Sequence, residues 1–437
     1  MHYSTYYHIM PDGTVKQINP FTGNEVWAVP GRSLKPYANS APARLPDTPI
    51  DAEIDRSSVC SFCPGRYFEV APEKSRWIHE EMAWIELSSL PASEYLSTVA
   101  EFRRVANLFE IVTLDYWKKN YGYAISADDR ERLDRYASTE DGFAHLKDRV
   151  QYRMSFRGPV PSLTERDVLE QSESFFGGCH EIIIARRHYT DDATTVAELV
   201  SSGLLSPDEH YHYFRSTVES LRQILMRNRY VRYVSVFQNW LSGAGASFDH
   251  LHKQLVGLDE WGASIDRQVK MLKDDPNVFN EYAANFAAMY NLVFAENEHA
   301  IAFVGIGHRF PTIEVFSRSR HSRPHEHSPE ELRGVSDLVH ACHAAMGPEI
   351  ACNEEWYYTP VDAIESMPWH ILIKWRINVT AGFEGGTSIF INPMTPLELR
   401  DWMVPRMYAL RDDGRLHGIR LAEECSIAPN PLKYYLG

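Results

Sequence analysis

The sequence has no long apolar run, no excess of positive charge and few cysteines. No segment approaches 18 uninterrupted apolar residues, and the start, MHYSTYYHIMPDG, lacks a basic head followed by an apolar stretch, so we expect neither a membrane helix nor a secretory signal. The 44 Lys and Arg residues against 59 Asp and Glu residues give a net charge of −15. This balance argues against nucleic acid or an anionic membrane as the main partner, and we expect a cytoplasmic protein.

Six cysteines in 437 residues are too few for a disulfide framework. Only Cys60 and Cys63 form a motif. The other four stand singly, as small buried apolar residues often do: Cys179, Cys342, Cys352 and Cys425. With 44% hydrophobic and 24% charged residues, the composition is that of a soluble globular chain. Its length is enough for two ordinary domains.

The first 60 residues are rich in Pro, Asn and turn signals, and residues 25–29 are typical of a short strand. From about residue 94 to residue 150, charged and apolar residues mix at helical spacing. We therefore expect an irregular strand-and-loop start followed by a mostly helical stretch.

The order of elements is repeated along the chain. A strand-like segment precedes a helix that opens at SPDE, and a second such segment precedes a helix that opens at SPEE. Both openings are capping boxes, Ser206 with Glu209 and Ser328 with Glu331. The sequence therefore predicts a duplicated α+β module, each copy a helix packed on an antiparallel sheet, joined through a helical stretch at about 260–291.

Residues His250, His252 and Gln254 alternate along a predicted strand and would share one of its faces. Forty-four positions separate Ser206 from His250, and 40 separate Ser328 from Pro368. In this register His252 corresponds to His370, but Pro368 and Leu372 replace the other two polar residues. A structural triplet would be needed in both copies, so we expect a site in the first copy only.

The pair Cys60 and Cys63 has the spacing by which one turn presents two thiolates to a tetrahedral zinc ion. A redox pair and a plain turn with two thiols are the alternatives, although the surroundings do not resemble a thioredoxin-like unit. The best candidates for the two further ligands are His188, at the end of the strand-like EIIIARRH, and His250.

His252 is the candidate nucleophile, because a neutral imidazole can attack phosphorus and form a phosphoramidate. Gln254 can donate an amide hydrogen bond to a phosphoryl oxygen. Gly243 and Gly245 would let backbone amides approach a phosphate, and Ser247 adds a hydroxyl. The alternative is a β-hairpin with exposed histidines.

These residues resemble the galactose-1-phosphate uridylyltransferase group of the histidine-triad (HIT) superfamily, which also includes ADP-glucose and diadenosine polyphosphate phosphorylases. The resemblance implies that His250 is a zinc ligand with Cys60, Cys63 and His188. It implies that His252 becomes nucleotidylated and that Gln254 holds the phosphoryl group. Asn239 and Ser247 match two phosphate-side residues of the family.

The resemblance extends to both ends of the chain. It implies that Arg32, Lys35 and Asn107 lie near the nucleotide, and that Glu384, in a strand, contacts the sugar hydroxyls. A helical insertion at about 112–172 departs from the family. So does the second copy, where Pro368 and His370 stand in place of a further metal-binding pair. In HSRPHEHS, a metal site and a solvated loop are the alternatives for three further histidines, His321, His325 and His327.

The resulting fold class is α+β: two fused HIT-like modules with a zinc-braced, irregular N-terminal segment and a helical insertion. We expect a catalytic module at 1–285 and a second module at 286–437. The expected activity moves a nucleoside monophosphate between a nucleoside diphosphate sugar and a sugar 1-phosphate through nucleotidyl-His252. The alternatives are a phosphorylase that uses inorganic phosphate on a nucleoside diphosphate sugar or a dinucleoside polyphosphate, and an inactive zinc-stabilised nucleotide-binding protein. The resemblance also implies a homodimer.

Overall fold

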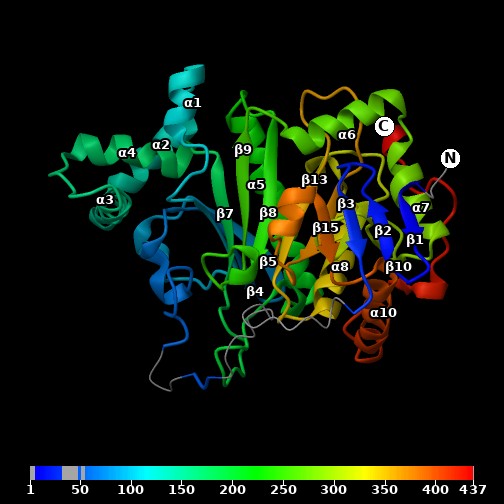
Figure 1. The fold of residues 1–437 in the computed structure, drawn as a ribbon. Coiled ribbons are helices and arrows are strands. Elements are labelled where there is room, and N and C mark those ends of the chain that lie inside the picture. Colours follow the sequence, from blue (N-terminus) through cyan, green and yellow to red (C-terminus); the bar gives the residue numbers. More distant parts are fainter. Residues whose placement is uncertain (1–4, 32–47, 51–54, 437) are drawn as a thin grey trace.

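The computed structural model describes residues 5–31, 48–50 and 55–436, and its centre is one antiparallel sheet (Figure 1). The first half of the chain supplies β4 (Glu73–Glu80), β5 (Ala83–Ser88), β6 (Phe102–Ala106), β7 (His180–Ala185), β8 (Tyr233–Trp240) and β9 (His252–Leu258). The second half supplies β10 (Val293–Glu296), β11 (Ala300–Val304), β12 (Thr312–Ser317), β13 (Cys352–Tyr357), β14 (His370–Trp375) and β16 (Arg420–Leu421). The strand order is β16-β10-β11-β12-β14-β13-β8-β9-β7-β6-β4-β5.

The two halves of this sheet mirror one another about the pair β8 and β13. In the first half β7, α5 (Pro207–Arg227), β8 and β9 follow in sequence, and in the second half β12, α8 (Pro329–Met346), β13 and β14 do the same. The two halves meet where Asn239 of β8 pairs with Asn353 of β13. Both predicted capping boxes, at Ser206 and Ser328, are formed. The predicted α+β fold of two fused modules is confirmed.

Helices α5 and α8 pack against each other and against the sheet. Lys253 of β9 points to this side, because its ammonium group lies over the rings of Tyr213 and Phe214 on α5. Since successive residues of a strand face opposite sides, His252 and Gln254 lie on the other face.

The mostly helical stretch expected over residues 94–150 is wrong in its first part, where β6 lies, and right from α1 (Leu114–Tyr121) onward. All five residues of β6 are buried. Arg103 and Arg104 are nevertheless accommodated, with Arg103 lying 3.7 Å from Glu73 and Arg104 2.5 Å from Glu181. The charged residues that suggested a helix therefore belong to β6, and their ion-pair partners come from distant parts of the sequence.

Four helices separate β6 from β7, although these two strands are neighbours in the sheet. They are α1 (Leu114–Tyr121), α2 (Ala127–Ala137), α3 (Glu140–Ser155) and α4 (Glu165–Gly177). The equivalent connection in the second half, between β11 and β12, spans only residues 305–311. Leu133, Leu146 and Phe175 form part of a separate small core under these helices, which project to one side of the sheet (Figure 1). The predicted helical insertion is confirmed, and "helical insertion" below means α1–α4.

A small second sheet lies against the second half of the chain. It consists of β1 (Tyr7–Ile9), β2 (Val15–Ile18), β3 (Glu25–Ala28) and β15 (Ile389–Asn392), with β15 parallel to β3. Asn19 donates to the backbone oxygen of Ile306 at 2.8 Å. The predicted strand at 25–29 is thus confirmed.

The remaining helices connect and cover the two halves. α6 (Ala263–Asp274), a π-helical turn (Asn280–Ala284) and α7 (Asn285–Met289) form the expected helical link, and α10 (Pro396–Asp412) packs on α8. Within the described ranges, no helix combines the length and apolarity that crossing a membrane requires. The division at residue 285, the cytoplasmic location and the homodimer stay predictions.

Candidate active site

Four side chains from three distant segments converge beside the start of β9. The ligand atoms of Cys60, Cys63, His188 and His250 all lie within 4.8 Å of one another. The two sulfurs are 3.8 Å apart. The Nδ1 atoms of both histidines lie 3.5 Å from the Cys60 sulfur, and 3.6 and 3.7 Å from that of Cys63. This cluster could bind a metal ion.

Local hydrogen bonds orient the cysteine turn and the His250 ring. The amide of Cys63 donates to the carbonyl of Cys60 at 2.9 Å and closes the turn that presents both thiols. His250 uses Nε2–H to donate to the carbonyl oxygen of Ala185 at 2.6 Å, which leaves Nδ1 free for a metal. Because β7 ends at Ala185, His188 is not at the end of that strand as expected but in the loop that follows.

His252 is oriented by the backbone of its own strand. Its Nδ1–H donates to the carbonyl oxygen of His250 at 2.7 Å, so the lone pair is on Nε2. The ring is 4% exposed, and burial lowers the pKa of His252 to about 4. Phe62, from the turn between the two cysteines, lies edge-on to this ring with the centroids 5.1 Å apart. The cysteine turn therefore also shapes the surroundings of His252.

Gln254 is held by two neighbours. The amide of Ile111 donates to Nδ1 of His180 at 3.1 Å, so Nε2 of His180 carries the proton and donates to Oε1 of Gln254 at 3.1 Å. The Asn107 side-chain amide donates to the same oxygen at 3.3 Å. Burial lowers the pKa of His180 to about 4. With its oxygen occupied in this way, Gln254 has its NH₂ group left as a donor.

These groups line a cavity of about 440 Å³, which we call the His252 cavity. Of the predicted residues, it brings together His252, Gln254, Asn107 and Ser247. Much of its wall is apolar, as in many small-molecule sites; this part includes Phe62, Val70, Val105, Ile182 and Phe248. A cavity of this kind can hold a flat ring beside one reactive imidazole and a few polar donors.

Phe62, Tyr152 and His180 are among the residues of the His252 cavity that were not predicted. His180 lies at the start of the strand HEIIIA. Its alternation with Ile182 and Ile184 was visible in the sequence. Its contact with Gln254 could not be predicted, because that contact depends on the pairing of β7 with β9. Tyr152 comes from α3, so the helical insertion forms part of the wall.

Other predicted residues lie elsewhere. Asn239 does not line the cavity; its Oδ1 accepts from Asn353 at 2.7 Å, which ties it to the second module. Glu384 does not line it either. It lies in the short helix α9 (Gly382–Thr387) rather than in a strand, because its carboxylate accepts from the amide of Ala381 at 2.8 Å and closes the first turn. Arg32 and Lys35 lie outside the described residues.

The second module keeps one element of the first. His370 donates through Nδ1–H to the carbonyl oxygen of Pro368 at 2.8 Å, just as His252 does to His250. Its ring is stacked between those of Phe316 and Tyr357. In the part of the chain that the structure describes, the cysteine and histidine cluster is the only group with metal-ligand geometry, and His321, His325 and His327 form no second one.

The whole architecture has known relatives. The chain matches, over residues 10–434, the family described as "Domain of unknown function (DUF4921)". This chain belongs to the DUF4921 family. It is also 23% identical over 175 residues to the ADP-glucose phosphorylase of Arabidopsis thaliana, which is 38% of this chain and 50% of that protein. The DUF4921 chain thus spans about half the length of the curated relative it matches.

Two solved structures share the fold. The ADP-glucose phosphorylase of Arabidopsis thaliana, with bound ADP-glucose, superposes with a TM-score of 0.55 at 17% identity, covering 90% of the DUF4921 chain and 98% of the other. A GalT-like protein from the same plant gives a TM-score of 0.51 at 16% identity with the same coverage. The DUF4921 chain therefore shares the fold of these two proteins, which is the fold that the sequence motifs predicted.

Proposed function

We propose that this DUF4921 protein is a nucleotidyltransferase that forms a covalent nucleotidyl-His252 intermediate. The observation that carries the proposal is the geometry of His252: its Nδ1–H is committed to the carbonyl of His250 at 2.7 Å, and the ring lines a cavity. A lone pair on Nε2 beside an amide donor suits attack on a phosphorus atom.

We further propose that zinc occupies the cluster of Cys60, Cys63, His188 and His250. Tetrahedral zinc with ordinary bond lengths requires about 3.8 Å between two sulfurs and about 3.6 Å between sulfur and nitrogen. The distances here are 3.8 Å and 3.5–3.7 Å. Four protein ligands leave no open position, so the zinc would have a structural role. The agreement between the observed distances and those of tetrahedral zinc also favours a metal site over a redox pair of cysteines.

In the first step, His252 Nε2 attacks the α-phosphorus of a nucleoside diphosphate sugar. A phosphorus–nitrogen bond forms while the bond to the bridging oxygen breaks, and that oxygen leaves with the bonding electrons on a sugar 1-phosphate. The NH₂ group of Gln254 and the hydroxyl of Ser247 donate to the phosphoryl oxygens as charge develops on them. Asn107 is proposed to contact the nucleotide. The roles of Arg32, Lys35, Asn239 and Glu384 stay predictions.

In the second step, an oxygen of a phosphate-bearing acceptor attacks the same phosphorus. The phosphorus–nitrogen bond breaks and its electrons return to Nε2, which regenerates the free imidazole. The acceptor is a sugar 1-phosphate in the transferase that the sequence motifs favour. Inorganic phosphate is the second candidate, and the sequence match to an ADP-glucose phosphorylase favours it.

Intact-mass spectrometry after exposure to UDP-, ADP- and GDP-sugars tests the proposal. We expect one donor to add the mass of its nucleoside monophosphate, and H252A to add none. His417 is exposed and lies outside the cavity, so H417A is the matched control and should label normally. Discharge of the label by a sugar 1-phosphate or by inorganic phosphate separates the two acceptors. Nucleotide binding without any retained label would instead identify an inactive nucleotide-binding protein.

A further inference from the structure

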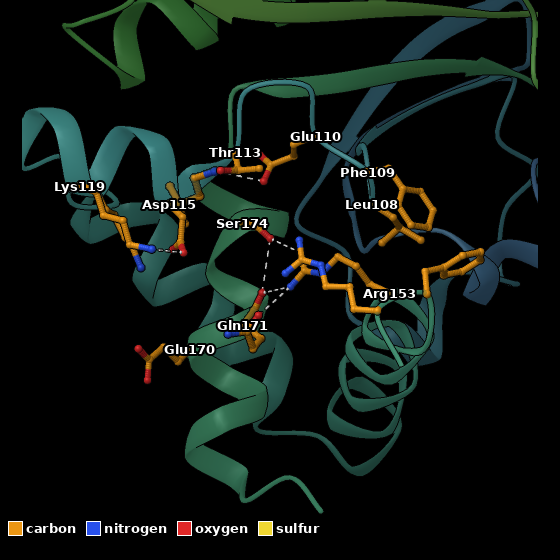
Figure 2. A pocket seen from close by; sticks show the side chains of 14 residues that line it. Leu108, Phe109, Glu110, Thr113, Asp115, Lys119, Arg153, Glu170, Gln171 and Ser174 are labelled. Carbon is orange, nitrogen blue, oxygen red and sulfur yellow. Dashed lines mark hydrogen bonds and ion pairs between the residues drawn. The ribbon is translucent and has the colours of Figure 1, made fainter. Parts of the chain in front are cut away.

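A second cavity, of about 530 Å³, lies between the helical insertion and the loop that joins β6 to α1 (Figure 2). We call it the insertion cleft. Its walls come from the loop residues Leu108 to Glu110 and from α1, α3 and the end of α4. This volume is in the range of small-molecule binding sites.

The insertion cleft collects positive charge in a chain whose net charge is −15. Four cationic side chains line it, against three carboxyl groups; the cations are Lys118, Lys119, Arg153 and Arg157. Lys118 is paired with Glu173, which leaves Lys119, Arg153 and Arg157 to attract a small anion. Because each anion would meet several donors here, phosphate is the group that fits best.

The cations differ in how free they are to meet a ligand. Arg157 is exposed, and its side chain has no partner among the described residues. Lys119 pairs with Asp115 at 3.1 Å, but both side chains are more than two-thirds exposed, so this pair is weak and can be replaced. Arg153 is fixed by donating to Ser174 Oγ at 2.8 Å and to the carbonyl of Gln171 at 2.7 Å (Figure 2).

The insertion cleft adjoins the His252 cavity, because Leu108 and Phe109 line both. Among the described residues that line the His252 cavity, none is a lysine or an arginine. The lysines and arginines that could bind a second phosphate of the ligand therefore line the insertion cleft, which is the cavity next to the one that contains His252.

A chain of contacts leads from the reacting imidazole to the insertion cleft. The reacting phosphate must lie near His252 and Gln254, and Gln254 contacts Asn107, which directly precedes the shared wall at Leu108 and Phe109. We take the nucleoside to extend in this direction. Phe109 and Phe156, 51% and 65% exposed, meet edge-to-face at 5.1 Å in the lining of the insertion cleft and offer apolar faces to a base or a ribose.

We propose that the insertion cleft binds a second phosphate group, carried on the ribose of the nucleotide whose 5′-phosphate reacts at His252. This inference rests on the proposed function and narrows its substrate class to nucleotides phosphorylated at two positions. Arg153 and Arg157 contact the second phosphate, and Lys119 leaves Asp115 to join them.

Calorimetric titration of the full chain with paired nucleotides tests this inference. The probes are the 5′-monophosphates of adenosine and uridine, each compared with its 2′,5′- and 3′,5′-bisphosphate. For the nucleoside that binds, we expect one bisphosphate to bind at least about tenfold more tightly, the effect of one good charge-assisted hydrogen bond. R157Q and K119Q should remove this advantage and leave the affinity for the monophosphate unchanged.

R166Q is the matched control, since Arg166 is an exposed arginine of α4 that does not line the cleft; it should keep the advantage. Equal affinity for monophosphate and bisphosphates would overturn the inference while the proposed function stands. An advantage that survives R157Q combined with K119Q would also overturn it. Binding of neither kind of nucleotide would contradict both the inference and the proposed function.

Discussion

His180 Nε2 lies 3.1 Å from Gln254 Oε1 and donates a hydrogen bond to it. This bond decides which end of the Gln254 amide is available as a donor, because an amide whose oxygen is occupied presents its NH₂ group elsewhere. His180 thereby acts as a positioning residue for Gln254.

Replacing His180 with Ala should slow covalent labelling by a nucleotide sugar about hundredfold to thousandfold, the range expected when one donor to a developing charge is lost. Single-turnover mass spectrometry measures the rate. Metal content should not change, and Q254A should be slowed by a similar factor. If H180A slows labelling in a Q254A background by the same factor as in the wild type, the two residues act independently and the positioning role is wrong.

Loss of a metal ligand should act on both stability and activity. C63S should bind less zinc than the wild type and unfold several degrees lower, because the proposed metal would join segments that are far apart in the sequence. Labelling should also fall, since Phe62 packs on His252 from the same turn. C425S is the matched control, because Cys425 lies outside the cluster. Elemental analysis and thermal unfolding decide the outcome; full zinc content in C63S would contradict the ligand assignment.

Much of the fold could be predicted because its signals are local. The capping boxes at Ser206 and Ser328 and the repeated order of strands and helices predicted the two modules. The four candidate metal ligands could be chosen because two cysteines at short spacing need two more donors. Features that depend on distant pairing could not be predicted. Arg104 belongs to a strand only because Glu181 neutralises it at 2.5 Å, and His180 gains its role only when β7 pairs with β9.

The contact between the two modules contains a buried ion pair. Lys253 of β9 lies 2.7 Å from Glu354 of β13, and neither side chain is exposed. Burial raises the pKa of Glu354, but Lys253 and His343 outweigh it and lower the pKa to about 2. K253M should lower the free energy of unfolding by about 3–5 kcal/mol, because it leaves a buried carboxylate without its cation.

Removal of the second charge should restore most of this loss. In the double variant K253M/E354Q, the glutamine can still accept from Trp356, which donates to Glu354 at 2.6 Å. Urea unfolding of the single and double variants measures the coupling. Purely additive effects would show that the pair does not join the modules.

A substitution at Glu110 should raise the free energy of unfolding, whereas K253M should lower it. Burial raises its pKa to about 7, so the folded chain holds this proton more tightly than the unfolded chain. Stability from this group is therefore full below the ordinary carboxyl pKa and is lost as the pH rises from about 4.5 to about 7.

E110Q should relieve the loss, because an uncharged amide can still accept from the amide of Leu114, as the carboxylate does at 3.1 Å. We expect E110Q to exceed the wild type by about 1–2 kcal/mol in urea unfolding at pH 8 and by much less at pH 5. E170Q, at an exposed carboxylate of the same cleft, should show no such pH-dependent gain, and an equal gain for E110Q at both pH values would refute the role assigned to its proton.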